Sequence, residues 1–224
     1  MVKLCVFDMD GLLLDTERLL YLQNAIDISR ELNYPMDEEF LRSQMGANWQ
    51  LYQNNIVKKM GDDFPIEEYL NRLWARIDHI IENEKIAFRP GAKEILDYCK
   101  ENDIKMVLAT STPYAKAIKC LENSGIKDYF EHIITGDMVE KGKPDPEIFL
   151  KAISFYPYDK SEIFVLEDGH NGTLAALGAG LRLILVEDLA YVSDEDRKNA
   201  ELHTDSLLKA IDYLRSLNET TLSV

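Results

Sequence analysis

The chain has 224 residues, which is enough for one sizeable domain or for a domain with an insertion. Hydrophobic residues make up 46% of it and charged residues 29%, as in ordinary soluble globular proteins. The formal net charge of −15 argues against nucleic acid or an anionic membrane as partner, but a small anionic substrate stays compatible because a bound metal can invert the local field.

Nothing in the sequence indicates export or insertion into a membrane. The first residues lack the hydrophobic region of a signal peptide, and no apolar stretch is long enough to span a bilayer. Cys5, Cys99 and Cys120 have an odd count and no metal-ligand spacing. They predict buried thiols in a reduced, cytoplasmic protein, and a reactive cysteine is the less favoured alternative.

Five apolar runs rich in β-branched residues predict buried strands. They are Val2–Phe7, Ile104–Ala109, His132–Thr135, Ile163–Leu166 and Arg182–Val186. Helical patterns separate the later runs, over Glu94–Lys100, Tyr114–Glu122, Glu147–Ser154 and Gly172–Leu177. For the second helix, Thr112 is the expected N-cap, Pro113 the first helical residue and Gly125 the end. This alternation predicts an α/β fold: a Rossmann-like parallel sheet with helices on both faces.

Residues 17–85 differ from the rest because they contain helical patterns and no convincing strand. The patterns cover Leu19–Glu31, Glu38–Gln44, Leu51–Met60 and Glu67–Asn83. We interpret residues 17–85 as an all-helical cap domain inserted into an α/β core domain of residues 1–16 and 86–224. The residues from Asn218 to Val224 are expected to be frayed.

Polar side chains follow four of the predicted strands, at the ends where ligands bind in parallel α/β sheets. They are Asp8 and Asp10 after the first, Thr110 and Ser111 after the second, Lys143 after the third, and Glu167 and Asp168 after the fourth. Because parallel strands end at one edge of the sheet, these positions are expected to meet there. The set makes chemical sense as a phosphoryl-transfer site.

In such a site each residue type has a role. Asp8 and Asp168 can supply the carboxylates that Mg²⁺ prefers, and a carboxylate can also act as a nucleophile. Asp10 is placed to protonate the leaving oxygen and then to deprotonate the attacking water. Lys143 and the Thr110 hydroxyl can stabilise the charge on the transferring group.

Each element also has an ordinary structural interpretation when it is taken alone. The paired aspartates can form a turn with a helix cap, and the residues from Thr110 to Thr112 can form a capping cluster. Lys143 can be a solvated lysine, and Glu167-Asp168-Gly169 a turn at a strand end. The catalytic interpretation is preferred because four separate strand ends agree on one chemistry.

Four motifs in this order resemble the haloacid dehalogenase-like superfamily, in the subfamily of beta-phosphoglucomutase and capped small-molecule phosphatases. The motifs are Phe7-Asp8-Met9-Asp10-Gly11 continuing to Glu17, Leu108-Ala109-Thr110-Ser111, Gly142-Lys143-Pro144-Asp145-Pro146, and Val165-Leu166-Glu167-Asp168-Gly169. The first motif is highly specific, and the resemblance covers nearly the whole chain.

The resemblance implies a role for each matching residue. Asp8 is implied to be the nucleophile and Asp10 the general acid and base. Mg²⁺ is implied to bind Asp8, the backbone carbonyl of Asp10 and Asp168, with Glu167 nearby in an outer or water-mediated role. Thr110 and Lys143 would hold the phosphoryl group. Where relatives often carry serine, this chain has Gly169-His170, and we expect a solvated or capping His170 rather than a catalytic one.

Within the superfamily, Asp10 favours phosphate esters, because the dehalogenases lack an acid at that position. Similar mutases tend to carry an arginine in the first cap loop, and the stretch from Met45 to Gln50 lacks one. A phosphatase is therefore favoured over a phosphomutase, although Arg42, Arg72 or Arg76 could substitute. A non-catalytic regulator that binds a phosphorylated metabolite is a third alternative.

The cap is expected to close over the site and to select the substrate. Ser111, Asn48 and Trp49 are the candidate substrate contacts, with core packing an equal alternative for Trp49. The expected partner is a small phosphorylated metabolite such as a sugar phosphate, and the expected oligomeric state is a monomer.

Overall fold

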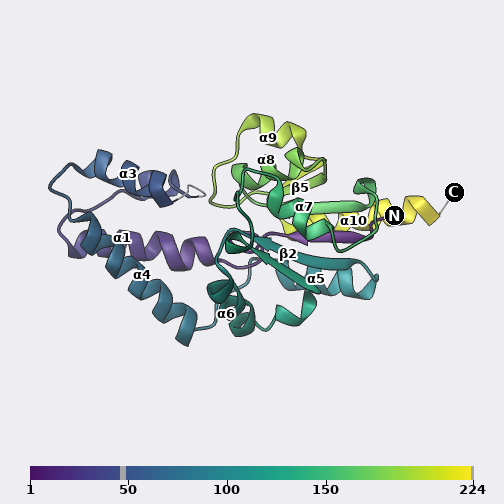
Figure 1. Cartoon of the computed structure of the whole chain (residues 1–224), viewed down its shortest axis with the longest axis horizontal. Coiled ribbons are helices and arrows are strands. Elements are labelled where there is room, and N and C mark those ends of the chain that lie inside the picture. Colours follow the sequence, from purple (N-terminus) through teal and green to yellow (C-terminus); the bar gives the residue numbers. More distant parts are fainter. Residues whose placement is uncertain (46–48, 223–224) are drawn as a thin grey trace.

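The computed structural model describes the backbone of residues 1–45 and 49–222. Within them, six parallel strands form one sheet in the order β3-β2-β1-β4-β5-β6 (Figure 1). The strands are β1 (Leu4–Phe7), β2 (Lys105–Thr110), β3 (His132–Thr135), β4 (Ile163–Glu167), β5 (Arg182–Val186) and β6 (Leu202–Thr204). The predicted α/β fold with a parallel sheet is confirmed.

Each face of the sheet carries its own layer of helices, because both faces of the central strands are apolar. Cys5 and Phe7 of β1 face one hydrophobic cluster, and Leu4 and Val6 face the other. The first cluster is covered by α5 (Ala92–Glu101), α6 (Tyr114–Ser124) and α10 (Leu207–Leu222). The second is covered by α7 (Glu147–Ile153) and α8 (His170–Gly178), with α9 (Asp194–Asn199) packed beside α8. Figure 1 shows α5 and α6 on one side of the sheet, and α7 and α8 on the other.

Between β1 and α5, the described residues form helices and no strand. They are the π-helical turn η1 (Glu17–Leu22), α1 (Gln23–Glu31), α2 (Glu38–Arg42), α3 (Trp49–Met60) and α4 (Ile66–Asn83). These helices lie to the left of the sheet in Figure 1. The expected helix over Leu19–Glu31 is therefore two elements, a wider π-helical turn followed by α1.

The two segments that join this helical insertion to the sheet run side by side. Leu14 and Phe88 form an antiparallel bridge. On either side of it, Asp15 N donates to Ala87 O at 2.9 Å, and Arg89 N donates to Leu13 O at 2.9 Å. The pairing joins the two ends of the insertion at the first motif.

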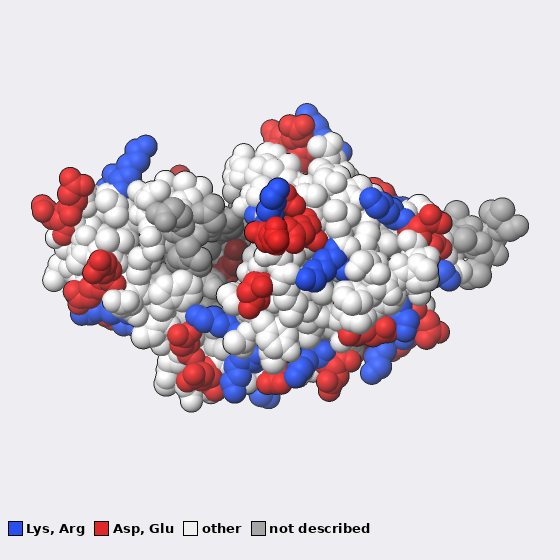
Figure 2. Space-filling model, in the orientation of Figure 1, with Lys and Arg blue, Asp and Glu red and all other residues white. Residues whose placement is uncertain are grey.

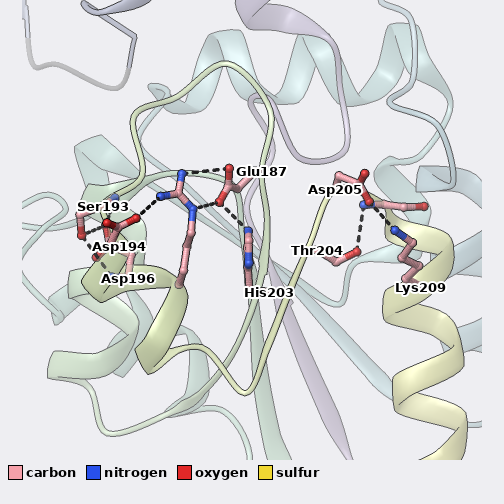
Figure 3. Close-up of polar contacts among 10 residues, drawn as sticks. Glu187, Ser193, Asp194, Asp196, His203, Thr204, Asp205 and Lys209 are labelled. Atoms are coloured by element: carbon pink, nitrogen blue, oxygen red, sulfur yellow. Dashed lines mark hydrogen bonds and ion pairs between the residues drawn. The ribbon is translucent and has the colours of Figure 1, made fainter.

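The last third of the chain contains an element that the sequence did not predict. β6 has only three residues and a histidine at its centre, so it lacks an apolar run. It pairs with β5, and His203 Nε2 pairs with Glu187 Oε1 at 2.5 Å, while Arg197 binds the same carboxylate (Figure 3). Tertiary contacts therefore define this strand.

The chain end also differs from expectation, because α10 continues to Leu222. Asn218 Oδ1 accepts a hydrogen bond from Val2 N at 2.8 Å, and the helix continues to Leu222, so the fraying predicted from Asn218 onward is wrong for residues 218–222.

None of the described helices is long and apolar enough to cross a membrane. On the face drawn in Figure 2, acidic and basic side chains are interspersed.

Candidate active site

The predicted polar positions meet at one edge of the sheet. β1 lies between β2 and β4, and Phe7 is in register with both Leu108 and Leu166. Asp8 continues β1, and its backbone N donates to Leu166 O at 3.0 Å. The positions after β1, β2 and β4 are therefore neighbours, as the sequence predicted.

Lys143 is the cation at the centre of this edge. Its side chain is only 6% exposed, so the alternative of a solvated lysine is wrong. Its Nζ donates to Asp8 Oδ1 at 2.5 Å, to Glu167 Oε1 at 2.6 Å and to Ala109 O at 2.9 Å. Burial alone lowers the pKa of Lys143, but the charges of Asp8 and Glu167 outweigh it and raise this pKa above its ordinary value. Lys143 is therefore charged.

Three hydroxyl groups fix the carboxylate of Asp10. Thr16 Oγ1 donates to Oδ1 at 2.7 Å, while Thr112 Oγ1 and Thr110 Oγ1 donate to Oδ2 at 2.8 and 3.1 Å. Neither Thr16 nor Thr112 was predicted to contact the site. In this structure the Thr110 hydroxyl is committed to Asp10, and its expected contact with a phosphoryl group stays a prediction.

The expected capping role of Thr112 is wrong, because its hydroxyl is directed at Asp10 instead. The N-terminus of α6 is capped by Asp137, whose two carboxylate oxygens accept from Tyr114 N at 3.0 and 3.2 Å. Pro113 is the N-cap residue, and Gly125 ends the helix in the left-handed conformation as predicted.

Asp8, Glu167 and Asp168 form a buried cluster that fits a divalent cation. Each offers one carboxylate oxygen, and these oxygens lie within 4.8 Å of one another. Among the described residues, no group bonds to the buried Asp168 Oδ2. A Cβ on Gly11 would lie 2.2 Å from this oxygen, so only glycine leaves that side of it open. Three carboxylates suit a hard cation such as Mg²⁺.

The carboxylates are costly to ionise without a cation. Burial is the main cause that raises the pKa of Asp8 to about 8, with Lys143 opposing it and Glu167 adding to it. Burial and the neighbouring charges of Glu17 and Glu167 likewise raise the pKa of Asp168. A bound divalent cation would reverse this balance and favour the charged forms.

These shifts predict how the stability of the metal-free protein depends on pH. Because Asp8 and Glu17 titrate near pH 8 in the folded chain and near pH 4 in the unfolded chain, the folded state binds more protons between these values. The free energy of unfolding then falls as pH rises from about 5 to about 8. In thermal melts, Mg²⁺ should therefore raise the midpoint over that in chelator by an amount that grows with pH. A constant difference across this range would contradict the expectation.

Glu17 is a further acidic residue at the site, and it was not predicted to have a role there. It begins the π-helical turn η1 and is 8% exposed. Burial, followed by the charges of Asp10 and Asp8, raises its pKa to about 8. The signal available in the sequence was its place in the first motif, directly after Thr16.

The remaining candidates lie outside this centre or outside the described residues. Ser111 is exposed, immediately after β2. Asn48 and the side chain of Trp49 lie outside the described residues, so their expected substrate contacts stay predictions. His170 is partly solvated, as expected, with 35% of its side chain exposed, and its Nδ1 also pairs with the buried Asp196 Oδ2 at 2.6 Å. Cys5, Cys99 and Cys120 are buried free thiols, as predicted.

Comparison with known proteins identifies the family of the chain. The haloacid dehalogenase-like hydrolase family matches residues 5–186. The chain is 29% identical over 214 residues to a phosphorylated carbohydrates phosphatase of Thermotoga maritima, covering 96% of this chain and 97% of that protein. It is 28% identical over 189 residues to hexitol phosphatase B of Escherichia coli, covering 81% of this chain and 82% of that protein.

A solved structure agrees over nearly the same length. CbbY from Rhodobacter sphaeroides, in complex with phosphate, superposes with a TM-score of 0.70 at 25% identity, covering 92% of this chain and 95% of that one. The match to the family takes in all four strand ends that the sequence singled out, Lys143 included. The chain therefore belongs to the haloacid dehalogenase-like hydrolase family.

Proposed function

We propose that this protein is a Mg²⁺-dependent phosphatase that hydrolyses a small phosphorylated metabolite through an aspartyl-phosphate on Asp8. The observation that supports this most is the separate fixation of two aspartates. Asp8 is held by the cation Lys143, while Asp10 is held by three neutral hydroxyls. Two carboxylates in different environments suit two different roles, nucleophile and general acid.

The reaction proceeds in two transfers. The Asp8 carboxylate attacks phosphorus, and the bond to the ester oxygen breaks as Asp10 protonates that oxygen. Asp10 then takes a proton from water, and this water attacks the aspartyl-phosphate to release phosphate and restore Asp8. The Lys143 ammonium stabilises negative charge on the transferring group in both steps.

Asp8, Asp168 and the backbone carbonyl of Asp10 would hold Mg²⁺, with Glu167 in an outer position. When bound, the ion neutralises charge on the phosphoryl oxygens and on the surrounding carboxylates. Glu167 is already engaged by Lys143 and by Asp168 N, the latter at 3.1 Å, which supports a positioning role for it.

The cap domain of residues 17–85 selects the substrate in this proposal. Its α4 contacts α6 of the core domain, where Lys116 Nζ pairs with Asp78 Oδ1 at 2.6 Å and lies 4.3 Å from the centroid of the Trp74 ring. The phosphatases of carbohydrates and hexitols among the similar proteins favour a sugar phosphate or a related compound. We further propose a monomeric, cytoplasmic enzyme without a nucleic-acid or membrane partner.

The direct test is phosphate release from a panel of sugar phosphates, polyol phosphates, nucleotides and p-nitrophenyl phosphate, with Mg²⁺ and with chelator. Release that requires Mg²⁺ is the expected result, and it ranks the substrates. If folded protein releases phosphate from none of them, hydrolysis is wrong. Conversion of glucose 1-phosphate to glucose 6-phosphate with a bisphosphate primer would then identify the phosphomutase alternative.

A further inference from the structure

Glu17 faces the acidic centre from the first residue of the helical insertion. The preceding residue, Thr16, is fully buried and donates to Asp10, so two consecutive side chains are directed at the site. In the π-helical turn that follows, the carbonyls of Leu19 and Leu20 accept hydrogen bonds from Asn24 Nδ2 at 3.1 and 2.9 Å. Such π-helical turns occur frequently at functional sites.

One oxygen of Glu17 is buried without a partner. Among the residues that the structure describes, no group donates to Glu17 Oε2, and Asp168 Oδ2 shares this condition. Both oxygens lie against the same side of Gly11, since a Cβ built there would be 3.4 Å from Glu17 Oε2 and 2.2 Å from Asp168 Oδ2. Two unsatisfied carboxylate oxygens at one position call for a cation or for the water bound to one.

We propose that Glu17 is a positioning residue for the divalent cation, accepting a hydrogen bond from a water ligand of the ion that Asp8 and Asp168 hold. This inference rests on the metal site of the proposed function. Glu17 is not one of the three residues whose oxygens lie within 4.8 Å of one another, which favours an outer contact over direct ligation. Because Glu17 belongs to the insertion, the ion also ties the first turn of the insertion to the sheet edge.

A direct contact with a substrate hydroxyl is the competing role. The position of Glu17 against Gly11 and beside Asp168 favours a contact with the metal's water ligand over a contact with substrate. Its unpartnered oxygen is enclosed by protein rather than exposed to an entering molecule. The two roles differ in what they do to metal affinity when no substrate is present.

The test measures Mn²⁺ and Mg²⁺ dissociation constants, by titration calorimetry and by the electron paramagnetic resonance signal of free Mn²⁺, without substrate. Glu17→Gln keeps the shape and removes the charge, and its dissociation constants are expected to rise about 10- to 100-fold, as for other outer-sphere partners of metal sites. Glu94→Gln removes a charge from the exposed face of α5 and should leave both constants unchanged. Glu17→Asp, which keeps the charge, should retain more affinity than Glu17→Gln.

Two further measurements separate the possible outcomes. The melting temperature of Glu17→Gln in chelator should equal or exceed that of the wild type, because a buried carboxyl group with an unpartnered oxygen among acidic neighbours is replaced by a neutral amide. If Glu17→Gln binds metal as tightly as the wild type, the proposal is overturned. If that variant has also lost phosphatase activity, Glu17 is assigned to substrate binding. If the wild type releases no phosphate but Glu17→Gln still weakens Mn²⁺ binding, the phosphatase proposal fails and the role of Glu17 stands.

Discussion

Asp8→Asn is expected to lower phosphate release by at least about 10⁴-fold, because the amide cannot act as the nucleophile that accepts the phosphoryl group. The substitution also weakens the metal site, so both contributions act in the same direction. Steady-state release of phosphate from the best substrate of the panel measures the loss, with Mg²⁺ at saturation for each protein.

The structure indicates that Asp8→Asn will fold. Lys143 keeps Glu167 as a partner at 2.6 Å, and one charge leaves a crowded acidic cluster. Asp128→Asn, at an exposed site far along the chain, is the matched control and should keep wild-type activity. Activity within about tenfold of wild type in well-folded Asp8→Asn would rule out Asp8 as the nucleophile.

Lys143→Met is expected to damage both stability and activity. The variant leaves the buried carboxylates of Asp8 and Glu167 without their cation, and removing one partner from a buried ion pair costs about 3–5 kcal/mol. In the proposed reaction it also removes the charge that would stabilise the transferring group, and turnover is expected to fall about 10²–10³-fold. Denaturant unfolding in chelator measures the first effect, and phosphate release measures the second.

Lys141→Met is the matched control, because Lys141 lies two residues away in the same loop and is exposed. Lys141→Met should change neither the unfolding stability nor the rate of phosphate release. Mg²⁺ should restore part of the stability of Lys143→Met, since a second cation then faces the same carboxylates. If Lys143→Met unfolded at the same denaturant concentration as Lys141→Met, the ion pairs described here would contribute nothing.

The sequence predicted the sheet and its functional edge because both depend on local patterns. Five strands appear as apolar runs, and the acidic residues that follow two of them stand at ends that parallel pairing brings together. The exception, β6, has no apolar run and depends on its pairing with β5 and on the contact between His203 and Glu187. Such a strand is defined only by the folded chain.

The hydroxyls of Thr16 and Thr112 and the carboxylate of Glu17 were not predictable in the same way. Thr112 has the pattern of an N-cap, and only the three-dimensional structure shows that Asp137, 25 residues later in the chain, takes the capping role. Thr16 and Glu17 follow a chain reversal, after which their side chains return to the end of β1. Spacing along the chain does not encode that return.

The most direct test of the central claim is the mass of the peptide containing Asp8 after rapid acid quenching during turnover. An enzyme that works through an aspartyl-phosphate should yield that peptide with one added phosphoryl group, labile to hydroxylamine, in the presence of Mg²⁺ and substrate. The Asp8→Asn variant should lack it. Rapid phosphate release with an unmodified Asp8 peptide at every quench time would contradict nucleophilic catalysis by Asp8.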